Sequence, residues 1–300
     1  GLQVIDIADP ANPQLVGGVD TPGWAVGVAI SGTHAYVADD DSGLQVIDIA
    51  NPASPQLVGG VDMPAPVHDV DLSGNSAYVV DADSGPQVID ITNPASPQLV
   101  GAVYMPGEVF GVVVSGPHAY VVGEAGLQVI DITNPASPQL VGGVDTPGDA
   151  RGVAISGSHA YVANGGDPQV IDISDPTSPQ LVGGVPTPGG AADIAVSGTH
   201  AYVAGGNLQV IDISNPAIPP LVGELDTGYA SGVALSGTHA YVVDLGDAEL
   251  LVVDITNPAS PQLVGEVETW GGLPQGIALS GDYAYMADEW MGLHVIDISN

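Results

Sequence analysis

Three side chains at the start of predicted inner strands could take part in acid–base chemistry. His68 and Asp69 are adjacent, and Arg151 is the only lysine or arginine in the chain. A histidine with a charged partner can act as a general base, which would make this a hydrolase or lyase centre. The sequence has no nucleophile elbow, no His-x-x-x-His metal pattern and no phosphate-cradling glycine loop. We therefore expect a non-enzymatic protein, in which Arg151 pairs with Asp149 or Asp193 and stiffens the fold.

Two acidic segments have a spacing that resembles part of a calcium-binding loop. They are Asp39-Asp40-Asp41-Ser42-Gly43 and Asp81-Ala82-Asp83-Ser84-Gly85. Alternating carboxylates before a glycine-led bend can direct oxygen ligands at a hard cation, and the ligands would be Asp39, Asp41, Asp81 and Asp83. Neither segment reaches the length of a full Ca²⁺ loop, and no distal bidentate glutamate follows. The pattern favours solvated acidic turns and no cofactor, with Ca²⁺ as the alternative.

A ligand-binding surface is the other chemistry that the sequence offers. The tryptophans lie outside the repeated segments, at Trp24, Trp270 and Trp290. An exposed indole near carboxylates supplies a flat apolar surface with hydrogen-bond acceptors, which suits a sugar or a peptide. His68, Asp69 and Arg151 would add polar contacts from the inner strands. In the alternative interpretation, the three indoles pack internally where the first and last repeats meet.

The charge of the chain excludes several kinds of partner. There are 35 acidic residues and a single basic one, which gives a formal net charge of -34. Such a surface repels phosphate backbones and anionic membranes, so we expect no nucleic-acid binding. No apolar run approaches ~18 residues, so we expect no membrane insertion. The chain has no cysteine, which excludes disulfides and thiolate metal sites. The acidity favours solubility, with a divalent cation or a cationic partner as the alternative.

The elements that would position these residues come from an internal repeat. A four-residue phrase, Val-Ile-Asp-Ile or a near copy, begins at Val4, Val46, Val88, Val129, Val170, Val210, Val252 and Val295. A period of ~42 residues is typical of repeat folds. Each unit contains four short runs with strand composition, such as 27–30, 34–38, 44–49 and 56–61, separated by Gly, Pro, Asn and Asp turns. Four strands per unit favour a β-propeller blade over a β-solenoid coil.

These units resemble the LVIVD-repeat family and, more distantly, other YVTN-like propellers. The phrase Leu-Gln-Val-Ile-Asp stands where the family has Leu-Val-Ile-Val-Asp, and the segment 250–254, Leu-Leu-Val-Val-Asp, is the closest copy. The resemblance covers essentially all 300 residues. It implies a secreted or cell-surface prokaryotic propeller, and it carries over no catalytic residue.

Counting the runs predicts an all-β, seven-bladed β-propeller with four antiparallel strands per blade. Residues 1–300 then form a single domain, closed by pairing of the N-terminal strand 14–19 with a last blade formed by residues 276–298. The run at 1–7 is surplus in this scheme. It would mark a boundary within a longer protein or array, or a pairing site for a neighbouring molecule.

Residues that recur in every unit are expected to be scaffold. The aspartate of the phrase would accept backbone N–H groups in the following turn, and a recurring tyrosine would pack between blades. We therefore predict a structural or interaction module outside the cell that associates with itself or with another surface protein, in an array or filament. The first alternative is a lectin-like module that binds a glycan, and the second is the enzyme considered above.

Overall fold

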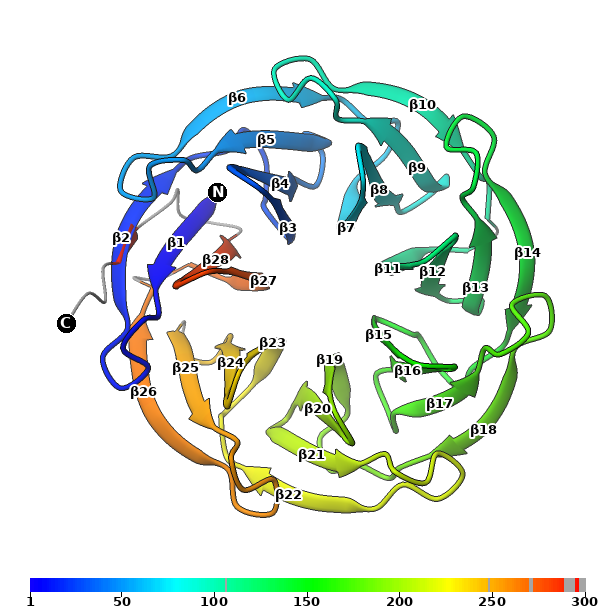
Figure 1. The fold of residues 1–300 in the computed structure, drawn as a ribbon, viewed down its shortest axis with the longest axis vertical. Helices are drawn as coiled ribbons and strands as arrows, with labels where there is room; N and C mark the ends of the chain where they lie inside the picture. The colour runs from blue at the N-terminus through cyan, green and yellow to red at the C-terminus, as the bar shows by residue number, and fades with distance from the viewer. Residues whose placement is uncertain (106, 248, 270–271, 289–294, 297–300) are drawn as a thin grey trace.

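The chain folds as a ring of β-sheets around a central axis. The computed structural model describes residues 1–105, 107–247, 249–269, 272–288 and 295–296. These residues form β-strands and no helix, and they include no helix that could cross a membrane. The strands make seven sheets arranged like the blades of a propeller (Figure 1). The seven-bladed fold with four antiparallel strands per blade is therefore confirmed.

Each blade has four strand positions, counted outward from the axis. The inner strands are β3 (Gly27–Ser31), β7 (Val67–Ser73), β11 (Val109–Ser115), β15 (Gly152–Ser156), β19 (Ala191–Ser197), β23 (Ala230–Ser236) and β27 (Pro274–Ser280). The second strands are β4 (His34–Ala38), β8 (Ser76–Asp81), β12 (His118–Gly123), β16 (His159–Ala163), β20 (His200–Gly205), β24 (His239–Asp244) and β28 (Tyr283–Asp288). The third strands are β5 (Leu44–Asp48), β9 (Gly85–Asp90), β13 (Gly126–Asp131), β17 (Gln169–Asp172), β21 (Leu208–Asp212), β25 (Glu249–Asp254) and β1 (Leu2–Asp6). The outer strands are β6 (Gln56–Val61), β10 (Gln98–Ala102), β14 (Gln139–Val144), β18 (Gln180–Gly184), β22 (Leu221–Leu225), β26 (Gln262–Glu268) and β2 (Gln14–Val19).

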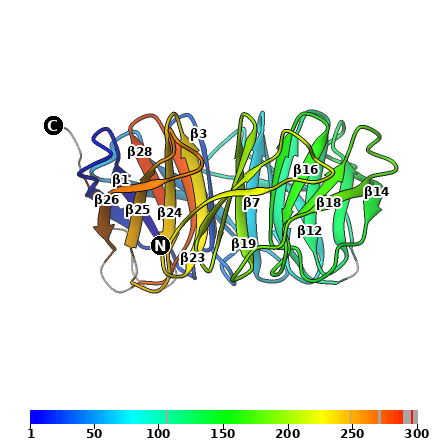
Figure 2. The ribbon, with the colours of Figure 1, turned by 90° about the horizontal axis from the view of Figure 1, so that it is seen from below.

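The blades are numbered in chain order. Blades 1 to 6 begin with β3, β7, β11, β15, β19 and β23, and blade 7 begins with β27. Figure 2 shows the ring from its edge, with the strands running between two faces. One face carries the connections from the second to the third strand and from the outer strand to the next inner strand, for example 39–43 and 62–66 in blade 1. These connections differ from blade to blade, so we call this the variable face.

Blade 7 closes the ring with strands from both parts of the chain, and here one prediction is wrong. Residues 1–7 are not surplus, because β1 fills the third position and pairs antiparallel with β28 from Leu2↔Ala287 to Asp6↔Tyr283. β29 (Val295–Ile296), part of the last copy of the phrase, lies parallel to β1 and also pairs with β2. The two copies have nearly the same sequence, so composition could not decide which one enters the ring.

The hydrophobic core lies between neighbouring blades. In one cluster, Tyr120 and Val122 of β12 pack with Val162 and Ile171 of the next blade. The recurring tyrosines are only 3–5 % exposed, as predicted, at Tyr36, Tyr78, Tyr120, Tyr161, Tyr202, Tyr241 and Tyr285. Burial, together with the nearby Tyr283, raises the pKa of Tyr285 to about 12. Each buried apolar side chain contributes about 1.5–3 kcal/mol, so these interfaces hold the ring together.

In blades 1 to 6, the outer strand also makes a close contact with a turn of the next blade. A Cβ atom added at Gly142 of β14 would lie 2.2 Å from the carbonyl oxygen of Pro176. The same short approach recurs at Gly59, Gly101, Gly183, Gly223 and Gly265. At Gly265 the approaching carbonyl belongs to Pro10, so this contact also spans the closure of the ring. Glycine is required wherever two backbones come this close.

The recurring aspartates are scaffold, as predicted. In the seven copies that lie within the described residues, the aspartate accepts the N–H group of the residue two positions later, for example from Thr92 to Asp90 at 2.9 Å and from Ser214 to Asp212 at 2.9 Å. Hydrogen bonds from the hydroxyl and N–H of Thr92 hold the pKa of Asp90 below its ordinary value. The carboxylates therefore fix the turn after the third strand.

Candidate ligand-binding site

A cavity of about 560 Å³ opens where the inner strands meet the variable face. All seven inner strands or the residues just before them contribute to its wall, and Trp24, Asp40, Tyr229 and Leu245 come from connections. Its position on the axis follows from the ring itself, since the seven inner strands surround this space (Figure 1). We call it the axial cavity. It has the size of a typical small-molecule site.

Along the inner strands, the residues at the wall of the axial cavity differ from blade to blade, whereas the opposite end of each strand is constant. The pairing of inner and second strands fixes which residues are equivalent in the seven blades. One equivalent position carries seven different side chains: Val26, His68, Phe110, Arg151, Ala192, Ser231 and Gln275. Five positions later the residue is serine in every blade. We call the seven variable positions the rim ring.

His68 and Phe110 stack on each other within the rim ring. Their rings stack at a centroid distance of 5.6 Å and an interplanar angle of 17°. His68 Nδ1 lies 3.0 Å from the carbonyl oxygen of Val109. Because a carbonyl can only accept, Nδ1 carries a proton and donates it to this oxygen.

Arg151 is an unpaired cation on the same ring. It is exposed, and among the described residues no carboxylate forms an ion pair with it. The expected partner Asp193 accepts backbone N–H groups instead, from Ile194 at 2.7 Å and from Val233 at 2.9 Å. The predicted pairing with Asp149 or Asp193 is therefore wrong. In a chain with 35 acidic residues, the one guanidinium is left available to an external group.

Two carboxylates next to the rim ring join neighbouring inner strands. Asp69 accepts N–H groups from Val70 at 2.8 Å and from Val112 of β11 at 2.9 Å, and Asp193 connects β19 to β23 in the same way. Burial raises the pKa of Asp69 to about 7, although the backbone donors oppose this shift. Burial likewise raises the pKa of Asp193 to about 6. Glycine occupies the equivalent position in the other five blades.

The exposed aromatic residues of the cavity mouth are held by buried carboxylates. Asp39, just after β4, accepts the Thr21 hydroxyl and, at 2.8 Å, the N–H group of Gly23. Asp244 at the end of β24 accepts the N–H group of Tyr229 at 3.0 Å. The loops that they hold present Trp24, which is 57 % exposed, and Tyr229, which is 62 % exposed. Both side chains are thus placed at the mouth of the cavity and remain largely exposed.

The four residues predicted as calcium ligands lie in two blades with different roles. Asp39 and Asp81 are buried and accept backbone N–H groups, which for Asp81 come from Ala65, Asp83 and Ser84. Asp41 and Asp83 are exposed. Within the described residues, neither pair has a third acidic or histidine side chain that could share a cation with it. A Ca²⁺ site at these turns stays a prediction, and the buried members have a sufficient role as loop anchors.

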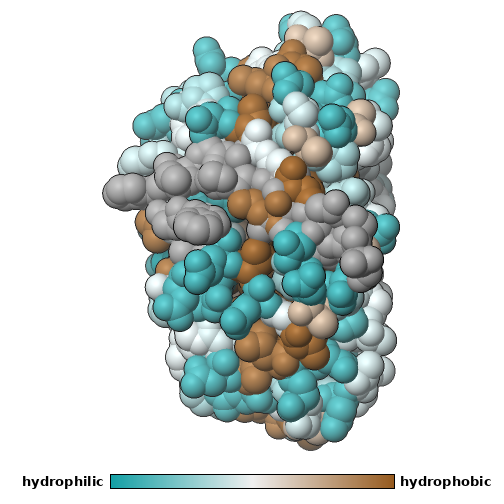
Figure 3. All heavy atoms as spheres, turned by 90° about the vertical axis from the view of Figure 1, so that its left-hand side faces the viewer, coloured by the Kyte–Doolittle hydropathy of each residue, from teal (hydrophilic) through white to brown (hydrophobic). Residues whose placement is uncertain are grey.

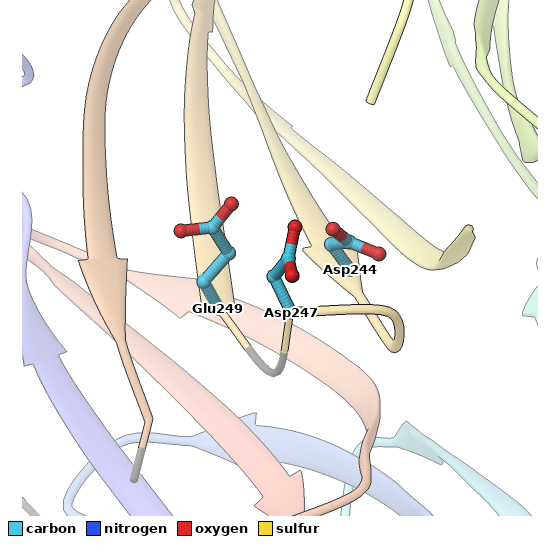
Figure 4. Close-up of side chains that lie close together, drawn as sticks. All are labelled: Asp244, Asp247 and Glu249. Carbon is cyan, nitrogen blue, oxygen red and sulfur yellow. The ribbon is translucent and has the colours of Figure 1, made fainter. Parts of the chain in front are cut away.

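One acidic cluster that sequence reasoning missed lies in blade 6. Figure 4 shows Asp244, Asp247 and Glu249 side by side, with ligand atoms within 4.8 Å of one another. Burial and then the neighbouring carboxylates raise the pKa of Glu249. Asp244 already accepts N–H groups from Tyr229 and Gly246. Proximity of acidic groups is the whole support for a cation here, so we assign no metal to this cluster.

The structure brings together four of the six predicted ligand-binding residues. Trp24, His68, Asp69 and Arg151 all line the axial cavity. Trp270 and Trp290 lie outside the described residues. Sequence reasoning did not place Ser231 and Gln275 in the site. Aligning the inner strands by register, rather than looking for chemically reactive residues, would have found them, since both occupy the rim ring.

Comparison with known proteins supports the fold. The model of the LVIVD repeat matches residues 1–21, 22–63, 66–104, 106–146, 147–187, 188–227, 227–269 and 271–300. A computationally designed protein, Ika8, is similar with a TM-score of 0.68 and 14 % identity, over 95 % of this chain and 100 % of that one. The β-propeller domain of Cps50 (Swd1) from Myceliophteria thermophila is similar with a TM-score of 0.71 and 13 % identity, over 93 % of this chain and 100 % of that one. The search of curated proteins found no match. At these identities the solved structures are similar in fold alone.

Proposed function

Because the chain belongs to the LVIVD repeat family and its blades surround one variable cavity, we propose that it is a non-enzymatic module that binds a small saccharide. The rim ring carries this proposal. Seven equivalent positions hold seven different side chains, while the opposite ends of the same strands all hold serine. Within the inner strands, different side chains at the cavity wall are what a binding site needs and what a scaffold does not. The extracellular, cell-surface location expected from the family resemblance stays a prediction.

The chemistry of the wall suits a sugar. Trp24 and the His68–Phe110 pair supply flat apolar surfaces, on which the C–H face of a sugar ring can lie. Asp69, Asp193 and Gln275 supply hydrogen-bond acceptors and donors around them for hydroxyl groups.

The environment of His68 supports binding rather than catalysis. Its Nδ1 hydrogen bond ends on the Val109 carbonyl, and among the described residues no carboxylate forms a hydrogen bond to the ring, although Asp40 is close enough to interact with it electrostatically. Among the described residues, no serine, threonine or tyrosine hydroxyl forms a hydrogen bond to His68. A base without an oriented nucleophile lacks the arrangement that covalent catalysis requires.

The test is a titration with neutral and acidic mono- and disaccharides, followed by tryptophan fluorescence and calorimetry. Changing Phe110→Ala removes half of the stacked pair, and the fold should tolerate it because Ala192 is the equivalent residue in blade 5. We expect Kd to rise several-fold for each saccharide that binds. Ile218→Ser is the control, since Ile218 is 74 % exposed in an outer turn away from the cavity. If no saccharide produces heat or a fluorescence change, the proposal is wrong.

Self-association is a second candidate function, favoured by the outer wall of the ring. Leucines on the outer strands are exposed by 37–47 %, at Leu57, Leu99, Leu140, Leu181, Leu221 and Leu263. Figure 3 shows apolar side chains in a band along the wall on the side of blade 7. The chain has no lysine, the residue that often protects sheet edges from pairing. The partner that fits such a repeated apolar band is a second copy of the chain.

Light scattering tests this second function. The double variant Leu99→Gln/Leu140→Gln places polar groups at two adjacent outer strands without touching the core. A self-associating protein should show a mass above that of one chain, and the double variant should lower it. A wild-type mass equal to one chain across the concentration range would exclude association.

A further inference from the structure

A second, smaller cavity joins the axial cavity at Arg151. It has a volume of about 160 Å³, and it shares Arg151, Ala192 and Tyr229 with the wall of the axial cavity. Its remaining wall is Ala191 and the three glycines Gly165, Gly189 and Gly205. We infer that the two cavities form one site, in which Arg151 binds the carboxylate of an acidic sugar such as a hexuronate. This inference rests on the proposed saccharide function and specifies its ligand.

The smaller cavity exists because its loops carry almost no side chains. Gly189 and Gly190 have φ values of +88° and +79°, which other residues rarely adopt. A Cβ atom at Gly205 would lie 2.2 Å from the carbonyl oxygen of Gly190. Side chains are thus excluded by backbone conformation and by close approach, and the space beside the guanidinium stays open.

The sector around Arg151 also lacks carboxylates that other blades have. In blades 1, 2, 6 and 7 the residue that follows or ends the second strand is a buried aspartate: Asp39, Asp81, Asp244 and Asp288. In blades 3, 4 and 5 the equivalent residues are Gly123, Asn164 and Gly205. Arg151 belongs to blade 4, in the middle of these three. Exposed carboxylates such as Asp149 and Asp167 lie on loops of this sector, but they form no ion pair with Arg151.

The single cation of Arg151 and the negative charge around it favour a carboxylate over a phosphate as the bound anion. The planar guanidinium fork binds a carboxylate through two parallel hydrogen bonds. A carboxylate carries one negative charge, which the single cation of Arg151 offsets, whereas a phosphate monoester carries about -1.5 to -2 at neutral pH. The excess charge of a phosphate would face Asp69, Asp193 and the net charge of -34. A carboxylate on a sugar ring therefore matches the site, with hydroxyls toward Gln275 and the ring face on the His68–Phe110 pair.

The chain itself supplies tolerated replacements for the test. Arg151→Gln introduces the residue that blade 7 has at the equivalent position, Gln275, and Ala192→Phe introduces the residue that blade 3 has, Phe110. The first change removes the cation, and the second narrows the junction between the two cavities. Arg151→Lys keeps the charge but removes the fork. Circular dichroism and thermal unfolding would check that each variant folds, with Ile218→Ser as the control.

The measurement is calorimetry or ligand-observed NMR with glucuronate, galacturonate, the two matching neutral hexoses and glucose 6-phosphate. For the hexuronate that binds, Arg151→Gln should raise Kd at least about tenfold, and Arg151→Lys should give an intermediate value. Kd for neutral hexoses should rise much less than Kd for the hexuronate in both variants, since neutral hexoses make no charge-assisted bond to Arg151.

Other results would overturn the inference in distinguishable ways. If neutral hexoses bind and Arg151→Gln leaves the Kd of the hexuronate unchanged, the saccharide function stands and the role of Arg151 is wrong. If glucose 6-phosphate binds more tightly than either hexuronate, the assignment of a carboxylate is wrong. If neither hexoses nor hexuronates bind, the saccharide function fails together with the inference.

Discussion

Asp69 and Asp193 show how single residues adapt a repeated scaffold. Each replaces a glycine that the other five blades have at the same position, and each uses its carboxylate to join two inner strands. The same two groups also line the axial cavity. A side chain that serves the wall of a site and the contact between blades couples ligand binding to the stability of the ring.

The raised pKa values predict how stability depends on pH. Burial raises the pKa of Asp69 to about 7 and that of Asp193 to about 6, above the value of 3.8 for an unperturbed aspartate. Between about pH 4 and about pH 7, these two aspartates bind more protons in the folded protein than in the unfolded chain. Their contribution to the free energy of unfolding therefore falls as pH rises through this range. Changing Asp69→Gly should flatten this dependence when thermal unfolding is compared at several pH values in that range.

The control for this prediction is Asp90→Asn. Hydrogen bonds from Thr92 lower the pKa of Asp90, so its contribution to stability is lost only as pH falls below the ordinary range of aspartate. The slope between pH 4 and 7 should therefore stay unchanged in this variant. An equal slope in wild type and Asp69→Gly would show that the Asp69 carboxylate ionises normally.

At the scale of strands and turns, the contact between successive blades requires glycine. Changing Gly142→Ala would place a methyl group 2.2 Å from the Pro176 carbonyl, between two backbones that cannot both move freely. We expect a loss of about 1–3 kcal/mol in the free energy of unfolding, measured by urea denaturation. Gly166→Ala is the matched control, since its nearest neighbour would be the Asn164 side-chain oxygen at 3.8 Å. Equal losses in the two variants would exclude the steric explanation.

The closure of blade 7 can be tested by the same method. Ile5 in β1 is fully buried between blades, so changing Ile5→Ala should destabilise the protein by about 2–5 kcal/mol. The matched control is Ile218→Ala, since Ile218 is 74 % exposed in an outer turn and its truncation should cost little. Equal losses in the two variants would mean that β1 does not fill the third position of blade 7 in solution.

The closure also shows where sequence reasoning stops. The strands, the turns and the number of blades follow from local composition and the period of the repeat, and the structure confirms them. Local composition does not decide whether residues 1–7 or the copy at 294–298 fills the third position of blade 7. Both segments have nearly the same sequence, and only the geometry of the closed ring distinguishes them. The site residues divide in the same way. Residue type alone identifies Trp24, His68, Asp69 and Arg151 as candidates, whereas Ser231 and Gln275 are identified only when the inner strands are aligned by register.

At the scale of the whole molecule, the net charge of -34 should influence how an acidic ligand reaches its site. The long-range field repels an anion, while Arg151 attracts it only at close range. Salt screens the repulsion first, since the Debye length falls from about 30 Å at 0.01 M to about 8 Å at 0.15 M. The association rate of a hexuronate should therefore rise with ionic strength over this range, as stopped-flow tryptophan fluorescence would show.

A neutral hexose provides the comparison for this rate measurement. It experiences no net force from the charged surface, so its association rate should not change with salt. A hexuronate rate that falls as salt is added would mean that a local positive field dominates the approach to the cavity.

The rim ring has a consequence for how such a protein can change. Val26 packs against an apolar cluster between blades, and His68 and Ser231 form hydrogen bonds to the next blade. The other four side chains, those of Phe110, Arg151, Ala192 and Gln275, belong to none of these apolar clusters. At those four positions, specificity can be altered while the apolar contacts between blades stay as they are. The rim ring thus combines variable binding-site positions with a constant scaffold. Each duplication of a blade adds one more position at which the side chain can change.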